Sequence, residues 1–348
     1  MKATFQQYVL NFKRPSGTSR GILTTKETWF IILTENDKWG IGECGLLRGL
    51  SIDDRPDYEE KLAWVCENIH LGLDKLYASL DEFPSIQFGL EMAFQSLEAE
   101  NPFVLFPSRF TEGKEGIPIN GLVWMGDKAF MKSQIKERIE AGFTCIKMKI
   151  GAIDFATEME LLRSIRKEFS ASQIEIRVDA NGAFNPSEAL EKLKRLSDLQ
   201  LHSIEQPIKP NQWQEMARLC EDSPLAIALD EELIGVFEKE AKKKLLETIS
   251  PQYIILKPSF IGGLQGSDEW IHLSEEMGVG WWITSALESN VGLNVISQYT
   301  FIKNSKLPQG LGTGSLYTNN IQSPLKIDQG AIYYYPFKKW NLETLKKD

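Results

Sequence analysis

The residues that build zinc sites and disulfide frameworks are scarce in this chain. Its 348 residues include four cysteines and three histidines. No two cysteines form a C-x-x-C motif and the histidines show no metal-ligand spacing, so we expect neither zinc ligation nor disulfide bonds. Sparse, scattered cysteines of this kind are typical of a reduced, cytoplasmic protein.

Positive charge and long hydrophobic runs are also in short supply. Lysine and arginine number 39 against 48 aspartates and glutamates, a net charge of −9, whereas contact with nucleic-acid phosphates needs a basic footprint. The longest apolar runs fall far short of the roughly 20 residues that cross a bilayer, and residues 1–14 lack the apolar core of a signal peptide. We expect a soluble protein with no nucleic-acid, membrane or obligate protein partner.

What the sequence does contain is the composition of a globular protein, with 42% hydrophobic and 25% charged residues. Its length favours two domains. Residues 28–43 are rich in aromatic and β-branched side chains and predict two antiparallel strands. Residues 57–80 and 85–98 carry apolar side chains at helical spacing. We predict a small α+β domain over residues 1–112, to which residues 322–348 return.

From residue 113 the pattern changes to a regular alternation of short apolar strands and helix-sized segments. The predicted strands are 117–124, 144–150, 174–180, 201–206, 225–230, 253–257 and 280–285. This alternation predicts parallel βαβ units, and seven or eight of them match an α/β barrel, which we place over residues 113–321. A doubly wound sheet would need a G-x-G-x-x-G turn after its first strand, and residues 121–126 (GLVWMG) do not supply one.

One charged residue stands at the end of each of five successive predicted strands. These residues are Lys149, Asp179, Glu205, Asp230 and Lys257, separated by 30, 26, 25 and 27 positions. Each therefore falls once per βα unit at the same height. In a barrel that height is the C-terminal rim, where catalytic groups lie.

The three carboxylates of this series predict a metal site. Two carboxylates about 4 Å apart repel each other by about 4 kcal/mol at an effective dielectric constant near 20, so three of them need a neutralising partner. A ligand set made only of oxygen suits a hard cation. We therefore predict that Asp179, Glu205 and Asp230 bind Mg²⁺, with Mn²⁺ as a substitute.

The two lysines indicate what such a site does. Lys149 and Lys257 lie four strands apart, which is diametrically opposite in an eight-stranded barrel. A small-molecule carboxylate held by the metal would lie between two ammonium groups. This arrangement is suited to removing a proton next to the carboxylate, with the cation stabilising the resulting negative charge.

Structural interpretations compete with these roles. A single Asp or Glu after a strand is usually a helix N-cap or a loop residue. Lys147 and Arg177 share strand parity with Lys149 and Asp179, so they could be buried charge partners. The glycine-rich residues 310–314 could form a phosphate-binding nest, which is a weak signal by itself. The agreement in type, order and spacing across five strands favours the catalytic interpretation.

The motifs around these residues resemble those of the enolase superfamily, in its muconate-lactonizing-enzyme-like subgroup. They are K-M-K at 147–149, D-A-N at 179–181, E-Q-P at 205–207, D-E at 230–231 and Lys257. The resemblance covers the whole chain. It implies an N-terminal α+β capping domain completed by the C-terminal segment, and a modified (β/α)7β TIM-like barrel that carries the active site.

Within the superfamily the chain is most similar to the o-succinylbenzoate synthase branch. The segments that carry this similarity are residues 19–21, 40–50, 285–289 and 310–320. The similarity implies a Mg²⁺-dependent syn dehydration of 2-succinyl-6-hydroxy-2,4-cyclohexadiene-1-carboxylate to 2-succinylbenzoate through an enediolate, a step of menaquinone biosynthesis. Lys149 would remove the proton and return it to the leaving hydroxide, and Lys257 would stabilise the anion.

The same resemblance implies residues that contact or support the substrate. The implied substrate-binding residues are Arg20, Lys147, Asn181, Ser285 and Gly312, and Arg177 is the implied structural support. One departure from many relatives is Glu232, where a serine is common; it adds a charge near the third metal ligand.

Two other classes of function remain open at this point. An N-acylamino acid racemase, a dipeptide epimerase or a cycloisomerase would use the same scaffold, and a two-base racemase would use the same two lysines. A non-catalytic barrel would be expected to lack at least one of the five functional residues. All five are present.

Overall fold

The computed structural model describes residues 1–18 and 21–345. Its N-terminal part is an antiparallel sheet in the order β1 (Lys2–Thr18), β2 (Gly21–Glu35) and β3 (Lys38–Cys44). Asn36, with φ of 54°, supports the tight turn between β2 and β3, because asparagine tolerates the left-handed region. The structure confirms the two predicted strands and adds β1, which the sequence pattern did not predict.

The N-terminal sheet, which we call the cap sheet, packs against α3 (Pro84–Glu98). Glycine permits the close approach, because a Cβ atom at Gly42 would lie 1.8 Å from the carbonyl oxygen of Gly89. The predicted helix over residues 57–80 is broken into α1 (Tyr58–Glu67), a 3-10 turn and α2 (Leu73–Ala78). The break falls at Gly72, whose φ of 80° ends the turn.

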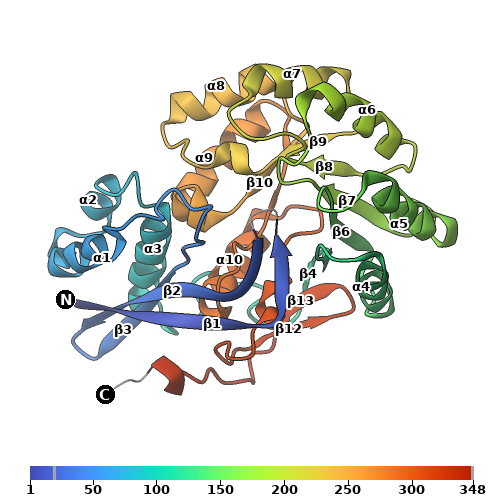
Figure 1. The fold of residues 1–348 in the computed structure, drawn as a ribbon. Coiled ribbons are helices and arrows are strands. Elements are labelled where there is room, and N and C mark those ends of the chain that lie inside the picture. Colours follow the sequence, from blue (N-terminus) through green and yellow to red (C-terminus); the bar gives the residue numbers. More distant parts are fainter. Residues whose placement is uncertain (19–20, 346–348) are drawn as a thin grey trace.

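The second sheet is parallel and forms the barrel, in the order β11-β10-β9-β8-β7-β6-β5. Its strands are β5 (Gly121–Val123), β6 (Cys145–Lys149), β7 (Glu175–Asp179), β8 (Ser203–Glu205), β9 (Ile227–Leu229), β10 (Tyr253–Leu256) and β11 (Gly280–Ile283). The helices between and after them are α4 (Lys128–Glu140), α5 (Phe155–Glu168), α6 (Pro186–Ser197), α7 (Trp213–Asp222), α8 (Lys239–Ile249), α9 (Gly263–Glu276) and α10 (Asn290–Lys303). Figure 1 shows α4 to α9 arranged around the outside of these strands.

Two residues close the barrel between its first and last strands. The amide of Asn120 donates to the carbonyl of Gln309 over 2.9 Å, and the amide of Gly310 donates to the carbonyl of Ile283 over 2.8 Å. The segment 309–310 therefore takes the place of an eighth strand. The expected α/β fold, a TIM-like barrel with seven βα units and a final strand, is confirmed.

The third sheet involves the C-terminal segment. It contains β12 (Leu325–Asp328), β13 (Ala331–Tyr334) and β4 (Ile117–Pro118). Strand β13 thus pairs with the start of the barrel segment and not with the cap sheet. The C-terminal segment contacts the N-terminal part through Tyr334, 6.0 Å from Phe110 between ring centroids, and through Trp340, which stacks on Phe103 at 4.1 Å. The domain boundaries after residues 112 and 321 stay predictions.

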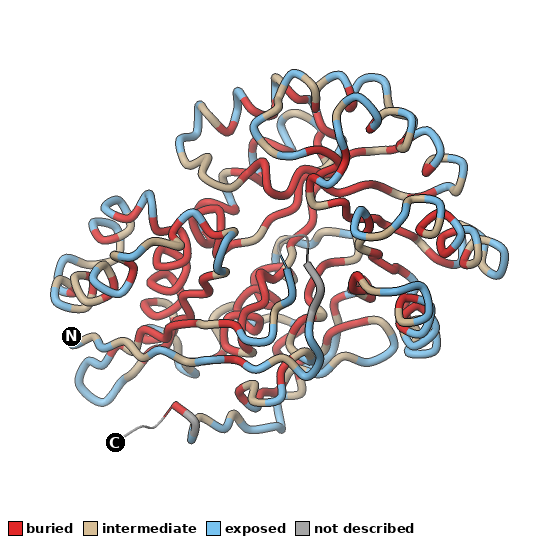
Figure 2. Tube along the Cα trace, in the orientation of Figure 1, coloured by how far each residue is buried: buried red, intermediate tan, exposed pale blue. Residues whose placement is uncertain are grey.

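Burial follows the layers of the fold. Figure 2 shows α3 and the central strands buried and the outer faces of α4 to α8 exposed. In α3, residues such as Phe88, Met92 and Leu90 are fully buried because this helix is covered by the cap sheet on one side and by the barrel on the other. Among the described residues, no helix has the length and apolar character needed to cross a membrane.

Candidate active site

The five charged residues predicted at the strand ends come together at one end of the barrel. Register explains why: in the parallel sheet Lys149 pairs with Asp179, and Asp179 pairs with Glu205. Asp230 and Lys257 directly follow β9 and β10. Because the side chains of paired residues in a sheet lie on the same face, the three paired residues all face the barrel interior.

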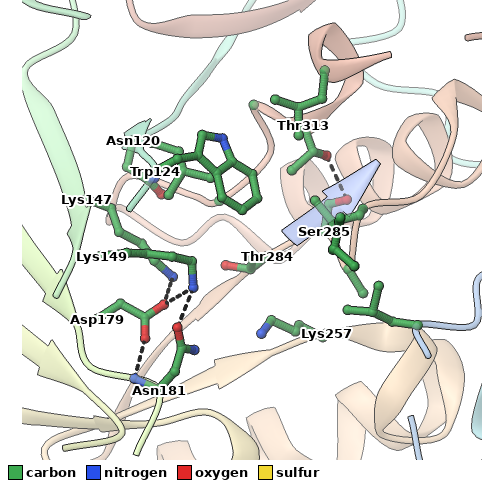
Figure 3. A pocket seen from close by; sticks show the side chains of 18 of the residues that line it. Asn120, Trp124, Lys147, Lys149, Asp179, Asn181, Lys257, Thr284, Ser285 and Thr313 are labelled. Carbon is green, nitrogen blue, oxygen red and sulfur yellow. Dashed lines mark hydrogen bonds and ion pairs between the residues drawn. The ribbon is translucent and has the colours of Figure 1, made fainter. Parts of the chain in front are cut away.

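These residues surround a cavity of about 490 Å³. Lys147, Lys149 and Asp179 form one wall, and Lys257 approaches from the other side (Figure 3). The carboxylates of Glu205 and Asp230 lie beneath the cavity lining, at 0% and 2% exposure. The predicted opposition of the two lysines across a central space is therefore what the structure shows.

Every carboxylate of the cluster contacts a lysine ammonium group. The ion pairs are Lys147 with Glu205, Lys147 with Asp179 (3.0 Å), Lys149 with Asp179 (2.9 Å) and Lys257 with Asp230 (2.5 Å). The lysine side chains are at most 13% exposed and the carboxylates at most 2%. Charge is thus balanced within a nearly dry pocket, where ionic interactions are strong.

Burial and charge act against each other on the pKa of each group. Burial would raise the pKa of Asp179. The positive charges of Lys147 and Lys149 nevertheless hold that pKa far below the ordinary range. For Glu205 burial prevails and raises the pKa to about 8. Burial would lower the pKa of Lys257, but the carboxylate of Asp230 raises it above the ordinary value. Between Asp179 and Glu205, Glu205 is thus the one whose charge is poorly compensated.

The chemistry of these carboxylates fits a hard cation. Oε1 of Glu205 is buried and accepts no hydrogen bond, although a buried carboxylate oxygen normally has a partner. In the part of the chain that the structure describes, no three acidic, histidine or cysteine side chains are close enough to enclose an ion as they stand. The lysine ammonium groups lie between the carboxylates instead. Flexible ammonium groups can withdraw, so the all-oxygen set suits a cation such as Mg²⁺.

Lys149 is held in place by a chain of polar contacts. Its Nζ donates to Oδ1 of Asn181 over 2.7 Å, and Nδ2 of Asn181 donates to Oε1 of Glu231 over 2.9 Å. Asn181 has a left-handed backbone with φ of 44°. The backbone N–H of Asn181 donates to Oδ1 of Asp179 over 3.0 Å. The D-x-N motif therefore turns the chain so that Asn181 points its amide group at the lysine.

The remaining predicted substrate contacts have different environments. Ser285 and Gly312 both line the cavity. The hydroxyl of Ser285 donates to Glu288 over 2.6 Å and accepts from Thr313 over 2.8 Å, so it is already engaged. Arg20 lies outside the described residues.

Two charged residues next to the motifs, Arg177 and Glu232, lie outside the cavity lining. Arg177 is fully buried, donates to Glu175 over 2.7 Å and to the carbonyl of Pro308 over 2.9 Å, and lies over the ring of Trp282. Glu232 accepts from the amide of Asn211 over 2.7 Å. Its extra charge is thus bound by the loop between β8 and α7 and lies outside the cavity lining.

The cavity also has lining residues that the sequence interpretation did not single out. They include Asn120, Trp124, Thr284, Glu231 and Arg138. Asn120 and Trp124 each lie two positions from Leu122 of β5, which pairs with Lys147. Because side chains alternate between the two faces of a strand, both residues are expected to point into the barrel, as Lys147 does. Applying that parity to the first predicted barrel strand would have found both.

Comparisons with known proteins agree with this geometry. The model of the family described as Enolase C-terminal domain-like matches residues 131–335. The chain is 47% identical to the o-succinylbenzoate synthase of Desulfotalea psychrophila, over 95% of this chain and 98% of that protein. The crystal structure of MenC from Desulfotalea psychrophila LSv54 superposes with a TM-score of 0.85 and 43% identity, covering 96% of this chain and 99% of that one.

A more distant structure supports the fold alone. Muconate lactonizing enzyme from Pseudomonas fluorescens, complexed with muconolactone, is 19% identical, with a TM-score of 0.82 over 98% of this chain and 97% of that one. The expected resemblance is thereby confirmed. The chain belongs to the enolase superfamily, in its muconate-lactonizing-enzyme-like subgroup.

Proposed function

We propose that this chain is an o-succinylbenzoate synthase, which removes water from 2-succinyl-6-hydroxy-2,4-cyclohexadiene-1-carboxylate to give 2-succinylbenzoate in menaquinone biosynthesis. The observation that carries the proposal is the 47% identity, over nearly the full length of both chains, to an enzyme of that activity. The site supports it, because two lysines face each other across a cavity bordered by carboxylates.

Members of this superfamily generally depend on a divalent metal. We propose Mg²⁺, held by Asp179, Glu205 and Asp230, with Mn²⁺ as a substitute. When bound, the cation would act as a Lewis acid for the substrate carboxylate and stabilise negative charge that develops beside it. The buried, unpaired Oε1 of Glu205 is the feature of this site that such a cation would satisfy.

The proton transfers are assigned to Lys149. As the neutral amine, its Nζ takes the proton from the carbon next to the ring carboxylate while the C–H bond breaks. The C–O bond to the hydroxyl group then breaks on the same face, and the same Nζ returns the proton to the departing hydroxide, which leaves as water. Asn181 keeps Nζ pointed into the cavity, because its amide oxygen accepts from that atom.

Lys257 is assigned an electrostatic role. It lies on the opposite side of the cavity from Lys149, where it would stabilise the anion that forms after proton removal. The carboxylates beside it keep its pKa above the ordinary value, despite a burial that acts to lower it. The assignment rests on the position of Lys257 across the cavity from Lys149.

A direct assay tests the proposal. Purified protein with Mg²⁺ is given the cyclohexadiene substrate, and formation of the aromatic product is followed by absorbance. N-succinyl amino acids and dipeptides are assayed beside it by polarimetry, because a racemase or epimerase would act on these. Turnover of the first substrate is expected to exceed the others by orders of magnitude. Efficient turnover of an amino-acid derivative with none of the cyclohexadiene would overturn the proposal.

We also propose that the protein works in the cytoplasm. All four cysteines are unpaired, and three of them are buried, as expected in a reducing compartment. Fractionation of the native cells, with detection by antibody, tests this location. Recovery of the protein mainly outside the cytoplasmic fraction would contradict it.

A further inference from the structure

The positive charges that border the cavity are not all neutralised. They belong to Arg48, Arg138, Lys147, Lys149 and Lys257. The three lysines contact the carboxylate cluster. Arg48 forms ion pairs with Glu27 and Asp54, both at 2.7 Å. Among the described residues, this leaves Arg138 as the one cavity cation without a carboxylate partner.

Arg138 is half-buried and lies near charges of both signs. Its Nε donates to the carbonyl oxygen of Leu122 over 3.2 Å, and its guanidinium carbon lies 5.9 Å from the ring centre of Phe143. Burial lowers the pKa of Arg138, and the charge of Arg14 lowers it further, although Glu137 acts in the other direction. No described residue accepts a hydrogen bond from its two terminal nitrogens. These two nitrogens of Arg138 are therefore available to an anion at that point.

The position of Arg138 relates it to the catalytic end of the cavity. It lies in the last turn of α4, against β5, and Leu122 of β5 pairs with Lys147 of β6. Arg138 packs beside Gly121 of β5, where a Cβ atom would lie 3.1 Å from its Cβ and Cδ, and β5 is the strand next to the one that carries Lys147 and Lys149. The cavity thus has a reactive end and, beside β5, a second point of positive charge.

We propose that Arg138 binds the second carboxylate of the substrate, at the end of its succinyl chain. The inference rests on the proposed function, since that substrate carries one carboxylate on the ring and one on the side chain. The ring carboxylate belongs to the reactive end. The terminal nitrogens of Arg138 match a carboxylate with two parallel hydrogen bonds, the geometry that arginine prefers.

A purely structural role for Arg138 predicts something different. The hydrogen bond from Nε to Leu122 by itself links α4 to β5, and a positive residue also suits the C-terminal end of a helix. Replacing such a structural residue would change the affinity for every ligand of the cavity by the same factor. A carboxylate-binding residue would matter only for ligands that carry the second carboxylate, and this difference can be measured.

Calorimetric binding of two ligands to the Mg²⁺-loaded protein separates these roles. The ligands are 2-succinylbenzoate and 2-butyrylbenzoate, which has the same chain length without the terminal carboxylate. In Arg138→Gln the affinity for 2-succinylbenzoate is expected to fall ten- to a hundredfold, and the affinity for 2-butyrylbenzoate to change less than twofold. Arg163→Gln, at an exposed position of α5, is the matched control and should change neither.

The outcomes distinguish the inference from the proposed function. An equal loss for both ligands, or no loss for either, would overturn the role of Arg138 while the wild-type protein still turned over the cyclohexadiene. No binding of 2-succinylbenzoate to the wild-type protein, together with no turnover, would overturn the proposed function. Arg138→Lys keeps the charge, and the same pair of ligands is measured with it if Arg138→Gln does not fold.

Discussion

Two buried charged regions of this molecule are built in opposite ways. In the active-site cluster each carboxylate contacts a lysine. At the junction of the cap sheet with the barrel, Glu43 is also fully buried, yet it accepts only from neutral groups: the hydroxyls of Thr28 and Ser289 and the amides of Ser289 and Gly292, at 2.5–2.9 Å. Among the described residues, the nearby ammonium of Lys26 has no hydrogen-bond partner.

The difference lies in how easily each set of partners can be exchanged. Backbone amides at the junction are fixed by the fold, so they bind Glu43 in one arrangement. The lysines of the site reach their partners over flexible four-carbon chains and can move aside for a cation or a substrate. Neutral, rigid donors therefore mark a structural carboxylate, and mobile ammonium partners mark a site that exchanges its contacts.

The two regions meet at one hydroxyl group. Glu288, at the junction, accepts from Ser259 over 2.5 Å and from Ser285 over 2.6 Å. Ser285 also lines the cavity. Glu288 lies beside Gly45, where a Cβ atom would be 3.1 Å from its Cγ, so damage at the junction should affect the site, but less strongly than damage within the site.

The largest expected effect is at the metal-ligand carboxylates. Exhaustive chelation should abolish turnover, and Mg²⁺ or Mn²⁺ should restore it, because these buried carboxylates are the proposed ligands of the cation on which the proposed chemistry depends. Asp179→Asn, Glu205→Gln and Asp230→Asn should each remove most activity. Full activity in the chelated enzyme would show that the cluster is structural, like Glu43.

The next effect separates the two lysines. Lys149→Ala should lower kcat by at least about 10⁴-fold, because two proton transfers each worth roughly 10²–10⁴ are lost. Lys257→Arg should keep more activity than Lys149→Arg, since arginine holds its charge but cannot accept a proton. Exchange of the substrate's α-hydrogen in D₂O gives a second readout. Near-normal turnover by Lys149→Arg with an inactive Lys257→Arg would reverse the assignment.

A smaller effect, on stability, is expected at the junction. Glu43→Gln keeps the shape but turns an NH₂ group toward donors such as the amide of Gly292. The free energy of unfolding should fall by about 1–3 kcal/mol, the usual cost of an unsatisfied buried group. Urea denaturation measures it, with the exposed Glu240→Gln on α8 as the control. If the urea midpoint of Glu43→Gln equalled that of the wild-type protein, the rigid donors around Glu43 would not be stabilising, and the contrast with the lysine partners of the active site would fail.

An effect of similar size is a pH dependence at the same junction. Glu91 of α3 accepts from the amides of Leu264 and Gln265 at the start of α9, at 2.5 and 2.9 Å, and burial raises its pKa to about 7 from a usual 4.5. The folded state therefore holds this proton more tightly than the unfolded chain. The resulting stability is complete below pH 4.5 and is lost as the pH rises through 7.

Substitution isolates that contribution. Between pH 5 and pH 8 the wild-type protein should lose about 1–3 kcal/mol from Glu91, and Glu91→Gln should show a flatter dependence by that amount. Unfolding in urea at both pH values measures the difference. Equal slopes in the two proteins would mean that the two amide hydrogen bonds keep Glu91 ionised throughout.

The sequence predicts the reactive end of the barrel well because its geometry depends on a repeat. Lys149, Asp179 and Glu205 fall once per βα unit, and parallel pairing then places them side by side whatever the details of the loops. The (β/α)-barrel and the capping region follow from the same periodicity. Their detailed roles remain predictions.

Features that depend on single long-range contacts were beyond the sequence pattern. The closing segment Gln309–Gly310 is too short to show an apolar run. Arg138 has the sequence context of an ordinary surface residue on a helix, and only the fold brings it to the cavity. In β1, polar and apolar residues alternate only weakly, and the strand contains Pro15. Neither periodicity nor composition therefore identified it.

The contacts of Glu43 also have a consequence for the order in which the protein is made. Its partners Ser289 and Gly292 follow 246 and 249 residues later in the chain. At the usual speed of synthesis the ribosome needs roughly 10–50 s to cover that distance. During this interval the carboxylate has only Thr28 within its own sheet, so water must solvate it and the cap cannot dock. We expect nascent chains that stop before residue 289 to be cut by protease at the cap, whereas the released full-length chain resists.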